Sequence, residues 1–90
     1  MKVKFFADIR PLAGCDELEW QEAAPTVGAL LAGLARRLGV PFGKRVIPDG
    51  ALSATIILMV NGRNVHLLQG LETPLAPDDT VVVFPMVAGG

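Results

Sequence analysis

Hydrophobic and polar residues alternate in two short stretches near the start of the chain. Residues 3–7 read Val-Lys-Phe-Phe-Ala and predict a strand with Val3 and Phe5 on one face and Lys4 and Phe6 on the other. Residues 17–21 read Glu-Leu-Glu-Trp-Gln and predict a half-buried strand. Between them, residues 8–14 contain Pro11, which lacks a backbone N–H, and Gly14, which suits a turn. The pattern therefore predicts an antiparallel hairpin whose loop has about seven residues.

A helical period replaces this alternation in residues 27–38. Thr26 is a good N-cap, Arg36 and Arg37 carry positive charge near the C-terminal end, and Gly39 suits the position after the helix. The apolar stripe consists of Val27, Leu30, Leu31, Leu34 and Leu38. This spacing predicts one amphipathic helix that packs on a sheet.

Residues 40–53 show neither the alternation of a strand nor the spacing of a helix, and they are rich in proline and glycine. We interpret them as an excursion on the surface, with one short turn around residues 42–47. Lys44 and Arg45 are then expected to lie in solvent, with a partner contact as the alternative.

The second half of the chain again has the character of a sheet. Residues 55–60 are almost continuously apolar, which predicts a central strand buried on both faces. Asn61 and Gly62 follow at once and predict a type I′ hairpin, with residues 63–66 as a short return strand.

The chain then reaches its last strand. Residues 71–75 form a loop that tucks leucines under the sheet, and a turn at residues 77–80 leads into the strand 81–84. The order is β-β-α-β-β-β, which predicts an α+β fold with a mixed sheet of four to five strands and one main helix. This arrangement is what a β-grasp, or ubiquitin-like, fold requires, with residues 1–90 as a single domain.

The composition excludes several classes of function. The net charge is −1, and the eight lysines and arginines are spread thinly, so a nucleic-acid partner is not expected. The longest apolar run, residues 56–60, is too short for a membrane span, and the first residues lack the apolar h-region of a signal peptide. We expect a cytoplasmic protein without a membrane partner.

Reactive side chains are few. Cys15 and His66 are each single in the sequence, so no cluster of metal ligands is expected. A thiol–imidazole pair between them is one alternative, and a half-buried cysteine with a histidine on a strand is the more ordinary interpretation. We expect no enzyme activity from this chain alone.

We expect residues 86–90, which follow the last predicted strand and Pro85, to form a flexible tail. Gly89 and Gly90 have no Cβ and could pass through a channel too narrow for other residues. The terminal carboxylate is ionised at neutral pH and could attack an activated phosphate. Taken alone, such an end also suits an ordinary frayed terminus.

Beyond its tail, the chain resembles a known family along nearly its whole length. The matching residues are Phe5–Ala7, Arg10, Leu12, Gly14, Thr26, Val27, Leu30, Val60, Asn61, Leu71, Thr73–Leu75, Asp78, Asp79, Val81, Phe84, Pro85 and Val87–Gly90. This pattern is similar to the MoaD/ThiS family of ubiquitin-like sulfur carriers, and most of all to the small subunit of molybdopterin synthase, MoaD. That subunit commonly has Phe-Pro-Pro-Val before its glycines, whereas here Met86 replaces the second proline.

The resemblance implies that partner proteins perform the chemistry. An E1-like adenylyltransferase of the MoeB/ThiF type would use ATP and Mg²⁺ to adenylate Gly90, and a sulfur donor would then leave a C-terminal thiocarboxylate. The large synthase subunit, of the MoaE type, would bind the tail and pass its sulfur to a pterin precursor in molybdenum cofactor biosynthesis. The chain itself would bind no cofactor stably.

The resemblance also implies which residues take part. Gly90 carries the transferred group, and Gly89 lets it pass along the channel. The residues expected to contact partners are Gly89, Ala88, Val87, Met86, Phe84, Phe5, Phe6 and Arg10. For Phe84 a place in the core of the last strand is an equal alternative, and Arg10 also suits a solvated loop.

Other functions stay open. Thiamine carriers of the ThiS type share the fold and tail but usually lack so long an excursion at residues 40–53, and cysteine-biosynthesis carriers of the CysO type are similar in the second half, including Gly70 and Leu71. Thiamine, cysteine or tRNA thiolation are therefore alternatives to molybdopterin. A ubiquitin-like modifier conjugated to lysines through Gly90 is a second class, and an enzyme that uses Cys15 is a third.

Overall fold

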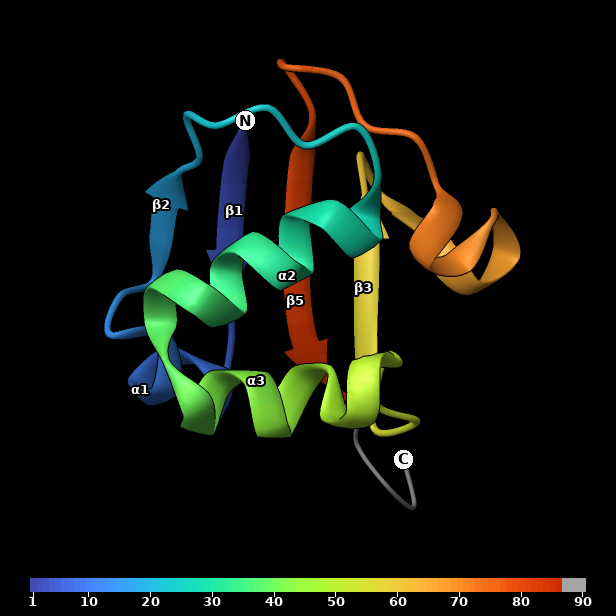
Figure 1. The fold of residues 1–90 in the computed structure, drawn as a ribbon. Coiled ribbons are helices and arrows are strands. Elements are labelled where there is room, and N and C mark those ends of the chain that lie inside the picture. The colour runs from blue at the N-terminus through green and yellow to red at the C-terminus, as the bar shows by residue number, and fades with distance from the viewer. Residues whose placement is uncertain (87–90) are drawn as a thin grey trace.

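Five strands form one sheet, and two helices cross it (Figure 1). The computed structural model describes residues 1–86. The strands are β1 (Lys2–Phe5), β2 (Glu17–Glu19), β3 (Ile56–Val60), β4 (Arg63–Asn64) and β5 (Thr80–Pro85). The helices are α1 (Ile9–Ala13), α2 (Val27–Leu38) and α3 (Val40–Val46), with 3₁₀ turns η1 (Pro48–Gly50), η2 (Val65–Leu67) and η3 (Gly70–Glu72).

The last strand lies at the centre of the sheet. The strand order is β2-β1-β5-β3-β4, and β1 runs parallel to β5 while the other neighbouring pairs are antiparallel. The predicted α+β, ubiquitin-like β-grasp fold and the order of its strands and main helix are confirmed. Because Pro85 ends the central strand β5, the chain leaves the sheet from its middle at Met86.

The main helix, α2, has the predicted bounds and the predicted ends. The Thr26 side chain accepts a hydrogen bond from the Ala29 N–H at 3.2 Å, and Gly39 ends the helix with a φ of 104°. The predicted stripe faces the sheet, with no exposed area on Val27, Leu30, Leu31 and Leu34. The 3.6-residue period and the two end signals therefore located this helix correctly.

The connection between the first two strands is not the loop of about seven residues that we expected. β1 and β2 pair antiparallel, but α1 lies between them and buries Ile9 and Ala13. Pro11 is compatible with this helix because it stands in the first turn, where its missing N–H costs no hydrogen bond. Gly14 does adopt the turn conformation, with a φ of 77°.

The prediction of a surface excursion at residues 40–53 was wrong for its first half. α3 occupies Val40–Val46, and its Phe42 and Val46 are fully buried. The Phe42 ring meets the Phe5 ring edge to face, with 5.8 Å between ring centroids and an interplanar angle of 88°. Burial of an aromatic residue and a valine four positions apart outweighs the weak helix propensity of this segment.

The predicted central strand is not buried on both faces. β3 is the neighbour of the central β5, and its residues alternate between buried Ile56, Leu58 and Val60 and half-buried Ile57 and Met59. Within the described part of the chain, helices cover only one face of the sheet, so a continuously apolar strand still leaves one side partly exposed.

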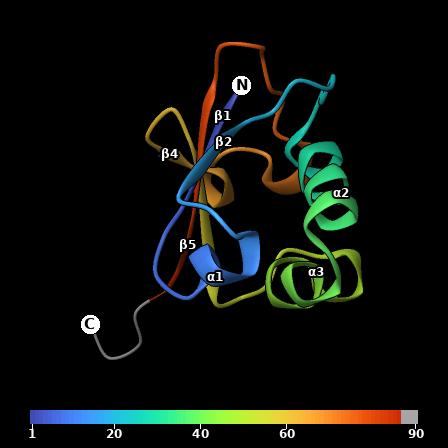
Figure 2. The ribbon, with the colours of Figure 1, turned by 90° about the vertical axis from the view of Figure 1, so that its left-hand side faces the viewer.

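The hairpin after β3 has the predicted turn but a shorter return strand. Asn61 and Gly62 have φ values of 51° and 83°, as a type I′ turn requires. β4 contains only Arg63 and Asn64, after which η2 continues the chain. Viewed along the sheet, α2 and α3 lie on one side of it, and no helix of residues 1–86 lies on the opposite side, which we call the open face (Figure 2).

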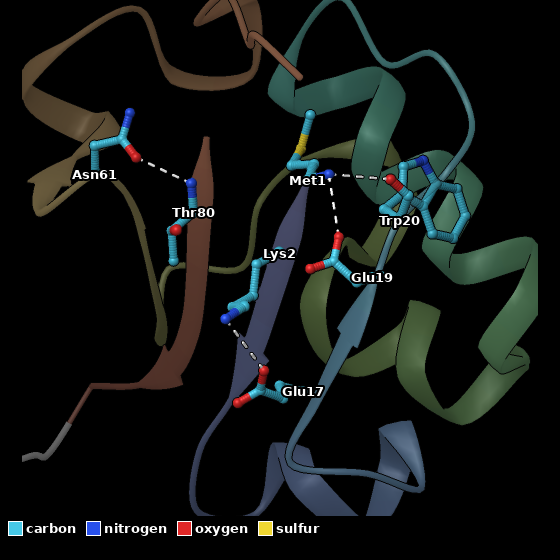
Figure 3. A network of polar contacts seen from close by, with 7 residues as sticks. All are labelled: Met1, Lys2, Glu17, Glu19, Trp20, Asn61 and Thr80. Carbon is cyan, nitrogen blue, oxygen red and sulfur yellow. Dashed lines mark hydrogen bonds and ion pairs between the residues drawn. The ribbon is translucent and has the colours of Figure 1, made fainter. Parts of the chain in front are cut away.

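Polar contacts tie down one end of the sheet (Figure 3). The N-terminal amine lies 3.5 Å from Glu19 Oε2 and donates to the Trp20 carbonyl at 3.3 Å, which joins the start of β1 to β2. The Thr80 N–H donates to Asn61 Oδ1 at 2.9 Å, which joins the start of β5 to the end of β3. These contacts fix the end of the sheet opposite the one from which the chain leaves β5.

Candidate partner-binding face

The open face of the sheet combines a charged side and an apolar side. Lys4 of β1 lies opposite Val82 of β5, and Val82 lies opposite Met59 of β3. Further along, Phe84 of β5 lies opposite Ile57 of β3. Because alternate residues of a strand face opposite sides, these side chains point away from the helices. The part of the open face that β5 and β3 form is therefore apolar, although no element of residues 1–86 covers it.

An apolar groove lies at the end of this face where the chain leaves β5. It is lined by Phe6, Ala7, Val82, Phe84 and Pro85, none of which has a polar side chain. The Phe6 N–H donates to the Val83 carbonyl at 3.1 Å, so the pairing of β1 with β5 continues one residue beyond β1. The structure thus brings together Phe6 and Phe84, two of the predicted partner-binding residues.

Phe5, the third predicted aromatic contact, lies elsewhere. It is fully buried on the helical face, where its ring packs against Phe42. Since successive residues of a strand point to opposite faces, Phe5 and Phe6 cannot both line the groove. Phe5 is a core residue and not a surface contact, which corrects the prediction. Phe84 is half-buried on the open face, so its alternative place in the core is also ruled out.

Arg10 is fixed at the rim of the groove and is not a freely solvated loop residue. Its guanidinium carbon lies 5.2 Å from the centroid of the Phe6 ring, within cation–π range. Its Nε donates to the Phe5 carbonyl at 3.0 Å and lies 3.5 Å from Asp16 Oδ1. With one face of its side chain on Phe6, Arg10 places a positive charge beside the apolar groove.

The last described residues bring the chain out beside the groove. Pro85 pairs with Ile56, and the Met86 N–H donates to the Thr55 carbonyl at 2.8 Å. Met86 is 53% exposed. The predicted roles of Val87, Ala88, Gly89 and Gly90 lie outside the described residues and stay predictions.

One residue near this exit was missed by the sequence reasoning. Arg45 was expected in solvent, but its side chain is only 27% exposed and contacts both Asp8 and Thr55. Its neighbour Lys44 is exposed, as expected. No pattern in the sequence distinguishes these two adjacent cations, because the difference arises only when α3 packs beside α1.

Cys15 and His66 do not form a reactive pair. Cys15 is half-buried just before β2, at one edge of the sheet, and its Sγ lies 3.8 Å from the Ala13 carbonyl. His66 is exposed in η2, which follows β4 at the opposite edge, so its predicted place on a strand was wrong. Residues 1–86 contain no group of three or more metal-ligating side chains and no helix long and apolar enough to cross a membrane.

Comparisons with known sequences identify the family of this chain. Residues 3–90 match the model of the ThiS family. A putative sulfur carrier protein of Archaeoglobus fulgidus is 42% identical over 74 residues, which are 82% of this chain and 84% of that protein. Small archaeal modifier protein 3 of Haloferax volcanii is 36% identical and covers 100% of this chain and 98% of its own length. The molybdopterin synthase sulfur carrier subunit of Escherichia coli is 33% identical, with 100% and 99% coverage.

Solved structures share the fold. Small archaeal modifier protein 1 of Methanosarcina acetivorans superposes with a TM-score of 0.80 at 34% identity and covers 99% of this chain and 94% of that one. CysO of Amycolatopsis orientalis, solved in a complex with BexX, gives a TM-score of 0.83 at 24% identity, with 99% and 98% coverage. The sequence relatives are named as carriers or modifiers and not as catalytic enzymes. The chain belongs to the ThiS family of ubiquitin-like sulfur carriers.

Proposed function

We propose that this chain carries sulfur as a thiocarboxylate on Gly90 and donates it in molybdopterin synthesis, as the small subunit of molybdopterin synthase. In the first step, a carboxylate oxygen of Gly90 attacks the α-phosphorus of ATP and releases pyrophosphate. In the second, hydrosulfide attacks the acyl carbon, AMP leaves with the electron pair of its bond, and a thiocarboxylate remains. ATP, Mg²⁺ and the catalytic groups belong to an E1-like adenylyltransferase, and we place this activity in the cytoplasm.

The observation that carries the proposal is the position of the apolar groove beside the exit of the chain from β5. Phe6, Val82 and Phe84 line this groove, and Pro85 belongs to both the groove and the exit. The four residues after Met86 can span at most about 14 Å, so a partner that reacts with Gly90 must lie close to this face. An apolar groove with aromatic walls is the kind of surface that anchors a protein partner.

The choice of molybdopterin as the acceptor rests on two similarities. The Escherichia coli molybdopterin synthase sulfur carrier subunit aligns with the whole chain at 33% identity. The residues that carry the resemblance to that subunit also include Phe6 and Arg10, which meet at the rim of the groove. We therefore propose a MoaE-type large subunit as the second partner, with the same face docking to it.

A second candidate function is conjugation to other proteins. It is favoured by small archaeal modifier protein 3, which is 36% identical over the whole chain. The same adenylate would then be attacked by a lysine amine of a target protein, which forms an isopeptide bond and releases AMP. Gly-Gly remnants on lysines of other proteins, found by mass spectrometry in cells that express this chain, would support this candidate.

Formation of the thiocarboxylate can be tested by intact mass. The purified chain is incubated with ATP, Mg²⁺, sulfide and an E1-like enzyme, and we expect a gain equal to the exchange of one oxygen for one sulfur. Deletion of Gly90 should abolish the gain, whereas Cys15→Ser should leave it unchanged, which excludes sulfur bound to the thiol. No gain with an enzyme that is active on another carrier would contradict the proposal.

The acceptor needs a separate test. The thiocarboxylated chain is mixed with a MoaE-type subunit and the pterin precursor, and we expect the sulfur mass to be lost as a dithiolene pterin forms. Transfer of the sulfur to a thiazole precursor or to an activated serine, with no transfer to the pterin, would contradict the molybdopterin assignment. The chain would then serve thiamine or cysteine biosynthesis instead.

A further inference from the structure

Arg45 joins three segments that are far apart in the sequence. It belongs to α3, and its Nε donates to Asp8 Oδ2 at 3.1 Å in the connection between β1 and α1. Its Nη1 donates to Thr55 Oγ1 at 3.0 Å, just before β3. The planar guanidinium can hold two acceptors in fixed directions, which a lysine ammonium cannot do in the same way. We call Asp8, Arg45 and Thr55 the bracket.

The bracket holds the residue that fixes the exit of the chain from β5. The carbonyl of Thr55 accepts a hydrogen bond from the Met86 N–H at 2.8 Å. Met86 is the last residue that the structure describes, so this is the last backbone hydrogen bond seen along the chain after β5. Ser53 also orients Thr55, because its Oγ accepts the Thr55 N–H at 3.2 Å and lies 2.9 Å from Thr55 Oγ1. The position of the Met86 backbone therefore depends on Thr55, and the Thr55 side chain is held by Arg45.

The other side of the bracket is connected to the apolar groove. Asp8 directly follows Ala7, which lines the groove and has a φ of 53°. This left-handed conformation is unfavourable for a residue with a Cβ, so surrounding contacts must hold it. The ion pair between Asp8 and Arg45 is a contact placed to do so. The bracket thus links the wall of the groove to the exit of the chain.

We propose that Arg45 is a positioning residue for activation of the C-terminus, which rests on the function proposed above. A partner that docks on the groove must find the reactive carboxylate at a fixed distance and direction from it. Holding the chain at Met86 reduces the conformations that must be lost when the carboxylate enters the partner's active site. In this proposal Arg45 acts through its hydrogen bond to Thr55 and not on the reacting atoms.

The test uses three variants of the whole chain. Arg45→Met removes the guanidinium but keeps an unbranched side chain, and Arg45→Lys keeps the charge without the planar fork. Lys44→Met is the matched control, because Lys44 is the neighbouring exposed cation on α3 and its loss changes the net charge equally. Thiocarboxylate formation is measured at several concentrations of each chain, and exchange of the Met86 N–H is measured by NMR.

The kinetic readout separates positioning from a loss of folding. Because this chain is the substrate of the activating enzyme, a partly unfolded variant supplies less competent substrate, which raises the apparent KM and leaves kcat unchanged. We expect Arg45→Met to lower kcat about three- to tenfold at an unchanged KM, and Arg45→Lys to restore part of it. We also expect the Met86 N–H to exchange faster by a similar factor in Arg45→Met. Lys44→Met should have the kcat and the exchange rate of the wild type.

Two results would overturn the inference. One is an unchanged exchange rate of the Met86 N–H in Arg45→Met, which would show that the bracket does not hold the exit. The other is a wild-type kcat in Arg45→Met despite faster exchange. Failure of the proposed function looks different, because the wild-type chain itself would then gain no sulfur while the exchange measurement could still be made.

Discussion

The two faces of the sheet are built from the same strands but differ in how completely they are covered. On the helical face, Val3, Phe5, Leu58, Val81 and Val83 have no exposed area. On the open face, the residues between them are half-buried and include Phe84 and Val82. The comparison shows that one set of alternating residues supplies the core, and that the other set is free to form a surface for partners. Substitutions on the two faces should therefore have separable effects.

The largest effect is expected on the helical face, from Phe42→Ala. Phe42 is fully buried and packs against Phe5, so the change leaves a cavity between α3 and the sheet. We expect the free energy of unfolding to fall by about 3–5 kcal/mol, measured by urea denaturation. The control is Val40→Ala on the same helix, where the side chain is 67% exposed and the loss should stay below about 0.5 kcal/mol. Equal losses in the two variants would show that α3 is not part of the core.

The next effect is expected on the open face, from Phe84→Ala. This change removes one wall of the groove while the helical face stays intact. We expect the Kd for the activating enzyme to rise about 30-fold, which corresponds to a hot-spot contact of about 2 kcal/mol. Met59→Ala is the control, because it also removes an apolar side chain from the open face but does not line the groove. An equal weakening by Met59→Ala would mean that the whole face, and not the groove, binds the partner.

A smaller effect is expected where α2 touches the edge of the core. A Cβ on Gly33 would lie 2.6 Å from Trp20 Cζ2, and the buried indole has little room to move. We expect Gly33→Ala to lower the free energy of unfolding by about 1–2 kcal/mol, although alanine favours the helix. A Cβ on Gly43 in α3 would lie 3.4 Å from its nearest neighbour, the Ala35 Cβ. Gly43→Ala should therefore raise the free energy of unfolding by about 0.5–1 kcal/mol. A higher free energy of unfolding for Gly33→Ala than for the wild type would show that the Trp20 ring does not lie against Gly33.

The smallest effect is expected at the rim, from Arg10→Met. This change removes the cation above the Phe6 ring but retains apolar contact with it. We expect the Kd for the activating enzyme to rise about threefold at low salt and less at high salt, because the charge is partly exposed. A loss that does not depend on salt would show that Arg10 acts through packing and not through its charge.

Much of the fold could be predicted from the sequence, because its signals are local. Thr26, the apolar stripe after it and Gly39 located α2, and Asn61 with Gly62 located the hairpin, since each signal states a backbone requirement directly. The short helices α1 and α3 could not be located this way. Helices this short are stable only when they pack against the rest of the protein, as Phe42 of α3 does against Phe5. Packing between segments that are distant in the sequence leaves no periodic pattern within either segment.

The candidate site was predicted in part for the same reason. The alternation of β1 already implies that Phe5 and Phe6 face opposite sides, but only the position of the helices decides which of them is buried. The place of Arg10 on Phe6 and of Arg45 between Asp8 and Thr55 depends on tertiary contacts alone. No sequence pattern carries that information.

The division between the two faces is tested most directly by thiocarboxylate formation per folded molecule in Phe84→Ala and Phe42→Leu. The folded fraction of each variant is measured by circular dichroism, and the initial rate at a concentration below KM is divided by it. The account predicts a rate well below wild type for Phe84→Ala and a wild-type rate for Phe42→Leu, which weakens only the core. A wild-type rate for Phe84→Ala, with a reduced rate for Phe42→Leu, would contradict it.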